Sequence, residues 1–169
     1  ADPTNGGTGE EFTAGYEYAG EIAAVGEDAG GWQVGDPVMG TIPSAFAEYL
    51  VADHRFVLPR PDGLAAEVAC ALPTALLTEF GALRTAGFER GRSVLITGAS
   101  TSIGMIGVQI AKTLGASQII ATTRSAGKRE LLTSLGADTV IVTGDEDLTD
   151  AVLSVTGDNG VDIVLDHVA

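Results

Sequence analysis

From Ser93 to Leu165 the chain alternates short apolar runs with segments whose apolar residues recur at helical spacing. The predicted strands cover 93–97, 118–123, 139–142 and 161–165, and the predicted helices between them cover 103–114, 128–135 and 148–155. Strands that are joined through helices run parallel in one sheet, because each helix carries the chain back to the edge where the next strand begins. This alternation therefore predicts an α/β fold with a doubly wound parallel sheet.

The chain before residue 59 follows another pattern, in which short β-branched and aromatic segments are separated by Gly-rich turns. A polar, Gly-rich lead-in over 1–13 precedes strand-like segments at 16–25, 32–40, 46–51 and 55–58. Pro59-Arg60-Pro61 ends this region, and helical spacing follows over 64–72 and 76–86. We therefore predict two domains, a partial β-rich domain over 1–58 and a partial α/β domain over 59–169.

The composition excludes several classes of protein. A net charge of −14 leaves no basic face for nucleic acid, and anionic membranes would repel the chain. Cys70 is the only cysteine, which rules out a disulfide framework and any zinc site with two thiolates. No apolar run reaches the ~18 residues of a membrane span. These features predict a cytoplasmic protein that acts on small molecules, without a nucleic-acid or membrane partner.

A turn of small residues follows the first strand of the alternation and reads Thr97-Gly98-Ala99-Ser100-Thr101-Ser102-Ile103-Gly104. A strand, a small-residue turn and a helix start form the dinucleotide-binding arrangement, because free N–H groups and the helix dipole favour a pyrophosphate. The strict G-x-G-x-x-G pattern is not met, so an ordinary turn of a flavodoxin-like sheet remains the alternative. The predicted contacts are Ser100, Thr101, Ser102, Ile103 and Gly104.

The end of the second predicted strand bears on the choice of cofactor. A site that prefers NAD places Asp or Glu there for the ribose hydroxyls, whereas this chain has Thr123. The cationic residues Arg124 and Lys128 come shortly after Thr123 in the sequence, and they would attract a 2′-phosphate. We therefore predict NADP(H) as the cofactor, bound by Thr123, Arg124, Ser125 and Lys128. The alternative is a solvated helix start with incidental basic residues.

Many motifs of the chain, in one order, resemble the medium-chain dehydrogenases/reductases, and within them the quinone-oxidoreductase and enoyl-reductase branch. The matching segments are Gly15–Gly20, Val34–Val38, Phe46–Val51, Leu72–Thr78, Ser93–Ser100, Val108–Lys112, Leu135–Asp138 and Val161–Asp166. The resemblance implies a Rossmann-type sheet preceded by a partial, chaperonin-10-like catalytic domain.

The resemblance also bears on metal binding. Zinc alcohol dehydrogenases of this family carry a histidine ligand at the position of Tyr16, and another ligand, commonly a cysteine, near Thr74. Neutral tyrosine and threonine are poor zinc ligands, so we expect a zinc-independent protein with no metal site. The two histidines, His54 and His167, are expected to be surface or capping residues.

The zinc-free branch implies an oxidoreductase that transfers hydride from NADPH to a quinone or to an activated C=C bond. The resemblance places Thr78 beside the nicotinamide, with a helix-surface hydroxyl as the alternative. Tyr16 is expected to be a proton donor or a ring-stacking wall, or else a strand packing residue. Glu17 would orient a neighbour or pair with a basic side chain. Asp166 would contact a ribose or cap the following turn.

The chain is about half as long as is usual in this family. We therefore expect an incomplete reductase, without the strands that precede Ala14 and follow Ala169 in the family. One alternative is a short paralogue that serves as a non-catalytic dinucleotide-binding or interaction module. Another is that a partner chain completes the sheet, and a homo-oligomer is compatible with that arrangement.

Overall fold

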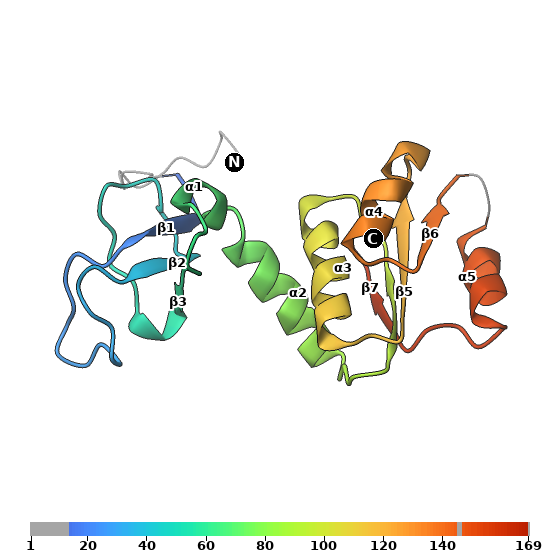
Figure 1. The fold of residues 1–169 in the computed structure, drawn as a ribbon, viewed down its shortest axis with the longest axis horizontal. Coiled ribbons are helices and arrows are strands. Elements are labelled where there is room, and N and C mark those ends of the chain that lie inside the picture. Colours follow the sequence, from blue (N-terminus) through green and yellow to red (C-terminus); the bar gives the residue numbers. More distant parts are fainter. Residues whose placement is uncertain (1–13, 145–146, 169) are drawn as a thin grey trace, which may run out of the picture. The chain divides into compact units, whose positions relative to one another are not determined.

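The computed structural model of the protein describes residues 14–144 and 147–168 (Figure 1). The predicted lead-in over 1–13 lies outside the described residues. The chain divides into two compact units, Ala1–Thr74 and Ala75–Ala169, within helix α2 (Pro73–Thr85). Residues 59–74, which the sequence pattern assigned to the second domain, therefore group with the first unit.

The first unit is built on a small antiparallel sheet. Its strands β1 (Glu17–Glu21), β2 (Pro37–Thr41) and β3 (Val57–Pro59) lie in the order β1-β2-β3. The 3-10 turn η1 (His54–Phe56) and the short helix α1 (Ala66–Ala69) complete the unit. Tyr18 faces Gly40 across the sheet, and a Cβ at Gly40 would lie 2.6 Å from the Tyr18 hydroxyl. The buried ring therefore requires glycine at position 40.

Two predictions for this unit are wrong. Residues 46–51 form no strand, and the side chain of Val51 is 92% exposed. The segment has strand-forming residues, but in the described part of the chain no neighbouring strand lies beside it to accept its hydrogen bonds. The helix expected over 64–72 is reduced to the single turn of α1.

The second unit confirms the predicted parallel α/β sheet. Its strands are β4 (Ser93–Ile96), β5 (Gln118–Thr123), β6 (Thr139–Val142) and β7 (Ile163–Leu165). They run parallel in the order β6-β5-β4-β7 (Figure 1). The chain winds from β4 towards β6 and then returns to add β7 on the other side. The strand order therefore reverses beside β4, which is where ligands bind in open sheets of this kind.

Helices cover this sheet because its central strands are apolar on both faces. The helical elements are α3 (Ser102–Leu114), η2 (Ala126–Lys128), α4 (Arg129–Leu135) and α5 (Leu148–Thr156). One core packs Val108 of α3 and Leu132 of α4 against the sheet, and the other packs Val152 of α5. None of the described helices is long and apolar enough to cross a bilayer.

The carboxylate of Asp162 joins β7 to the start of β4. It accepts hydrogen bonds from the backbone N–H of Ser93 at 2.8 Å and from the Ser93 hydroxyl at 2.8 Å, and it pairs with Arg92. The Ser93 hydrogen bonds, followed by Arg92, lower the pKa of Asp162. A lowered folded-state pKa contributes stability above the unfolded pKa of about 3.9, and this contribution is lost as the pH falls below that value.

We therefore expect Asp162→Asn to lower the melting temperature at pH 7, and the difference from the wild type to shrink as the pH falls from about 5 to about 3. Melting curves across this pH range measure it. Glu89→Gln is the control, because the Glu89 side chain has no hydrogen bond or ion pair among the described residues. A difference that stays constant with pH would show that the carboxylate charge at Asp162 does not matter.

Candidate functional site

The turn that follows β4 is fixed against the neighbouring strand β5. Gly98 has a φ of +56°, a left-handed conformation that favours glycine. The N–H of Gly98 donates to the Thr122 hydroxyl at 3.2 Å, and the N–H of Ala99 donates to the Thr122 carbonyl at 2.8 Å. The turn thus lies at the carboxyl edge of the sheet with a defined backbone course.

The first turn of α3 leaves donors available for a ligand. The Thr101 hydroxyl accepts from the N–H of Gly104 at 3.1 Å and donates to the Gly98 carbonyl at 2.9 Å. Within the described chain no hydrogen bond uses the N–H groups of Ser102 and Ile103. These two N–H groups lie at the positive end of the helix dipole, an arrangement that binds anions such as a pyrophosphate.

Gly104 allows α3 to start this close to the turn. A Cβ at Gly104 would lie 2.6 Å from the Ala99 Cα and 2.7 Å from the Gly98 carbonyl oxygen. Both are backbone atoms that cannot move aside without displacing the turn. Glycine at position 104 is therefore required for α3 to begin this close to the turn.

The end of β5 lies beside the same turn. The Thr123 hydroxyl donates to the Ser100 hydroxyl at 3.0 Å and accepts from the Ser125 N–H at 3.2 Å, and Thr123 is only 2% exposed. Thr123 therefore uses its hydroxyl inside the protein, where it holds Ser100 in place. The structure thus brings the predicted groups 100–104 and 123–125 together at one edge of the sheet.

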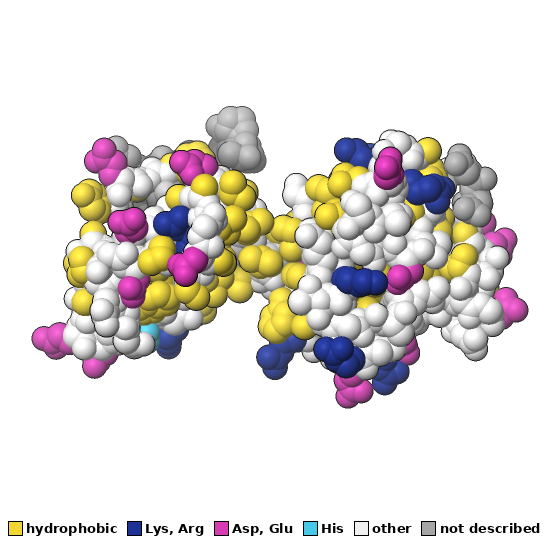
Figure 2. Space-filling model, viewed as in Figure 1, with side chains coloured by type: hydrophobic (Ala, Val, Ile, Leu, Met, Phe, Trp, Pro, Cys, Tyr) yellow, Lys and Arg dark blue, Asp and Glu magenta, His cyan; other side chains and the backbone are white. Residues whose placement is uncertain are grey.

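The basic residues after Thr123 differ in their surroundings. Arg124 and Lys128 are exposed, and neither side chain forms a hydrogen bond or ion pair among the described residues. The Arg129 guanidinium instead donates to the Val140 carbonyl of β6. Seven of the nine Lys and Arg residues of the chain belong to the second unit, and the visible face of that unit carries several of them (Figure 2). Arg124 and Lys128 are the cations available to an anionic ligand at this edge.

The segment after β7 is tied to the turn after β4. Asp166 accepts from the Thr97 hydroxyl and from the Val168 N–H at 3.0 Å. The Asp166 carboxylate thus caps the local turn, one of the two roles considered for it.

His167 belongs to a buried polar contact that the sequence analysis missed. Its Nε2 lies 2.8 Å from Oε1 of Glu79 on α2, and its Nδ1 lies 2.9 Å from the Thr97 carbonyl oxygen. The expectation of a surface or capping histidine is wrong. Glu79 stands four residues from both Ala75 and Leu83, which are buried, so a carboxylate on the apolar face of the helix was the available signal.

The two predicted catalytic residues lie in different units. Thr78 is exposed on α2 in the second unit, and Tyr16 is 71% exposed just before β1 in the first unit. The neighbouring Glu17 accepts a hydrogen bond from the Thr74 N–H at 2.8 Å, not from a basic side chain. Cys70 ends α1 as a free, partly buried thiol.

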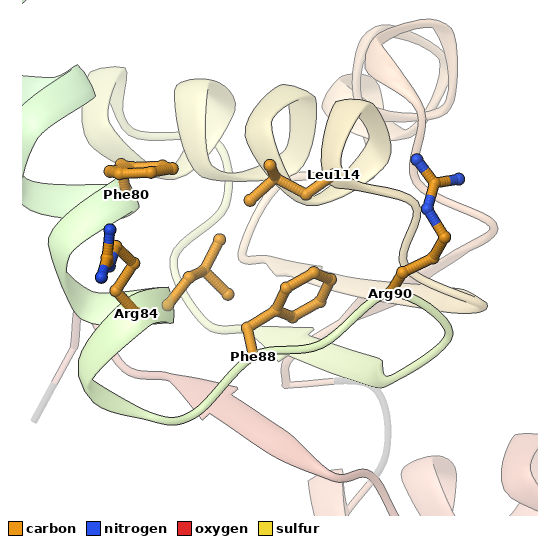
Figure 3. A pocket seen from close by; sticks show the side chains of 6 residues that line it. Phe80, Arg84, Phe88, Arg90 and Leu114 are labelled. Atoms are coloured by element: carbon orange, nitrogen blue, oxygen red, sulfur yellow. The ribbon is translucent and has the colours of Figure 1, made fainter.

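A groove of about 450 Å³ in the second unit lies away from the turn (Figure 3). It is lined by Phe80, Leu83, Arg84, Phe88, Arg90 and Leu114. Leu114 ends α3 and residues 86–92 lead into β4, so the groove lies at the amino edge of the sheet. The guanidinium of Arg84 is 6.0 Å from the Phe80 ring centroid, and both arginines stand near helix ends whose dipole favours cations. The groove is not part of the candidate site.

No group of three His, Cys, Asp or Glu residues that could hold a metal ion occurs in the part of the chain that the structure describes.

Two family models match the chain. A model for the alcohol dehydrogenase GroES-like domain matches residues 4–62, and a model for zinc-binding dehydrogenases matches residues 102–169. The chain is 38% identical over 137 residues to the 2-methylene-furan-3-one reductase of Solanum lycopersicum, covering 75% of this chain and 35% of that protein.

Solved structures show the same fold. The quinone oxidoreductase from Coxiella burnetii matches with a TM-score of 0.80 and 31% identity, over 95% of this chain and 50% of that one. The mycobacterial protein Rv1454c, solved in complex with NADPH, matches with a TM-score of 0.78 and 30% identity, over 94% of this chain and 51% of that one. The chain thus spans between a third and a half of the length of these relatives.

Proposed function

Because the chain belongs to the medium-chain dehydrogenase/reductase superfamily, we propose that it acts in a zinc-independent, NADP(H)-dependent reductase. The substrate would be a quinone or a C=C bond conjugated with a carbonyl group, the chemistry suggested by the names of the relatives. The observation that carries the proposal is the pair of cations, Arg124 and Lys128, beside a turn with two available N–H groups. The net charge of −14 and the single cysteine favour a cytoplasmic enzyme for small molecules.

The residues present fit a phosphorylated dinucleotide. The N–H groups of Ser102 and Ile103 would hold the pyrophosphate, and Arg124 and Lys128 would hold the 2′-phosphate, with Ser125 as a further donor. No carboxylate stands at the end of β5 to repel that phosphate. Asp166, which orients Thr97, would border the ribose. When bound, the nicotinamide supplies hydride.

The remaining roles fall to two exposed hydroxyl groups. Thr78 would contact the nicotinamide from α2, and Tyr16 would donate the proton or form one wall of the substrate site. Zinc independence follows from residue chemistry, because Tyr16 and Thr74 stand where the family's metal-binding members carry His and another ligand, commonly Cys. The proton is therefore expected to come from a side chain or water rather than from a metal-bound group.

Calorimetric titration of the chain with NADPH and NADH tests the proposal. We expect micromolar binding of NADPH and at least about tenfold weaker binding of NADH, since one charged contact contributes about 1.5 kcal/mol or more. Oxidation of NADPH at 340 nm, with a quinone and an enone as substrates, then measures activity. Equal affinities would contradict the 2′-phosphate assignment, and absence of binding would contradict the cofactor site.

A second candidate is a non-catalytic dinucleotide-binding module. It is favoured by the placement of every predicted cofactor contact in the second unit. Binding of NADPH without turnover of either substrate would support this candidate over the reductase.

A further inference from the structure

The carboxyl group of Glu79 is the most buried ionisable group of the second unit that the proposed mechanism does not use. Glu79 is 1% exposed, and its Oε2 atom has no hydrogen-bond partner in the described structure. Its Oε1 atom lies 2.8 Å from Nε2 of His167, a residue 88 positions away in the sequence. Burying a carboxyl group with an unbonded oxygen costs free energy, so the presence of Glu79 at this position needs a physical reason.

The contact requires a proton between the two side chains. The Nδ1 atom of His167 faces the Thr97 carbonyl oxygen, which can only accept, so Nδ1 carries a proton. The 2.8 Å contact then holds one more proton, either on the ring beside a carboxylate or on the carboxyl group beside a neutral ring. The pair is neutral overall in both forms, which reduces the cost of burying it.

The ring of His167 connects α2 to the turn that begins the candidate site. The N–H of His167 donates to the Thr97 hydroxyl at 3.0 Å, and that hydroxyl donates to Asp166. His167 therefore contacts Thr97 at two points, the carbonyl oxygen through Nδ1 and the hydroxyl group through its backbone N–H. Residue 97 precedes Gly98 and Ala99, whose N–H groups are bonded to β5.

Helix α3 is shaped to admit the buried carboxyl group. A Cβ at Gly107 would lie 2.5 Å from Oε2 of Glu79. The glycine therefore leaves the space that Glu79 occupies between α2 and α3. Because the obstructing atom is the far end of a flexible side chain, a methyl group at position 107 would displace Glu79 and leave the backbone of α3 in place.

We propose that Glu79, His167 and Thr97 form a positioning network that holds the nucleotide-binding turn and joins it to the helix that carries Thr78. The network rests on the proposed dinucleotide site. Replacing a buried polar pair with apolar residues is often neutral or stabilising, so stability alone does not explain the pair. A positioning role explains the pair, because α2, the turn after β4 and the segment after β7 meet at His167 beside the proposed cofactor site.

Glu79→Leu and Glu79→Gln are the matched variants. Leu removes the hydrogen bond to His167, whereas the Gln amide can donate to Nε2 and keeps His167 bonded to Thr97. In the nucleotide-free chain we expect amide exchange at Gly98, Ala99, Thr101 and Gly104 to accelerate at least about tenfold in Glu79→Leu and less than about threefold in Glu79→Gln. The amides of Ala137 and Asp138, at the far end of the sheet, serve as internal controls and should not change.

Gly107→Ala gives a second approach if Glu79→Leu fails to fold. It should accelerate exchange of the same four amides and weaken NADPH binding about tenfold, although Ala is the better helix former. In a Glu79→Ala background the same change should add nothing, because no carboxyl group is left to displace. An effect of equal size in both backgrounds would overturn the network.

The exchange measurement separates the network from the cofactor proposal. Unchanged exchange at the turn in Glu79→Leu would overturn the network whatever the nucleotide affinity. Faster exchange with unaltered NADPH affinity would overturn its role at the cofactor site. Failure of the wild-type chain to bind NADPH would contradict the proposed function, and the exchange rates would still decide whether Glu79 holds the turn.

Discussion

The double variant Arg124→Asp/Lys128→Ala is expected to weaken NADPH binding about 100-fold while changing NADH binding less than about threefold. Each charged contact to the 2′-phosphate contributes about 1.5 kcal/mol or more, and two such losses correspond to about two powers of ten in Kd. NADH lacks this phosphate, so it loses only a weak long-range attraction. Calorimetric titration of both nucleotides measures the two affinities.

The control variant is Arg84→Asp/Arg90→Ala. It changes the net charge by the same amount, but both arginines line the groove at the amino edge of the sheet. We expect less than a threefold change for either nucleotide, because charges this far apart are screened at physiological salt. Equal losses of NADPH and NADH in the test variant would contradict the assignment of Arg124 and Lys128 to the 2′-phosphate.

Replacing Gly104 with Ala is expected to destabilise the second unit by about 2 kcal/mol and to abolish detectable NADPH binding. The added methyl group would meet the backbone of Gly98 and Ala99 at under 3 Å, so either the turn or the start of α3 must move. That loss corresponds to a fall of roughly 10 °C in melting temperature for a unit of this size. Thermal unfolding with and without NADPH measures both effects.

Gly81→Ala is the matched control, since Gly81 also lies in a helix but a Cβ there would meet nothing within 4 Å. Its expected effect has the opposite sign, a gain of about 0.5–1 kcal/mol from higher helix propensity. A stable Gly104→Ala variant that binds NADPH normally would show that α3 does not need to start so close to the turn.

The fold of the second unit was predictable because local signals and burial agree there. The boundaries of β5 and β6 match the predicted residues, since each strand is an apolar run ended by a turn. Residues 46–51 have the same kind of local signal, yet they form no strand. A strand needs a neighbour, and the presence of a neighbour cannot be read from the segment itself.

One part of the candidate site could also be predicted from the sequence, and another part could not. The approach of Ser100 to Thr123 follows from the order of the parallel strands, because both residues stand where neighbouring strands end. The contact between Glu79 and His167 joins residues 88 positions apart, and no sequence pattern within either segment predicts it. The spacing of Glu79 from Ala75 and Leu83 could have placed it on a buried helix face, but its partner depends on tertiary structure.

The reversal of strand order beside β4 also has a consequence for folding. The neighbours of β4 are β5, which follows it after one helix, and β7, which follows β6 and α5 in the described part of the chain. Thr97 bonds to His167 across 70 positions, so this pairing closes a long loop, whereas β4, β5 and β6 pair successively along the chain. We therefore expect the turn after β4 to gain its partners on β5 first and its contact with His167 afterwards, because the longer loop costs more entropy to close.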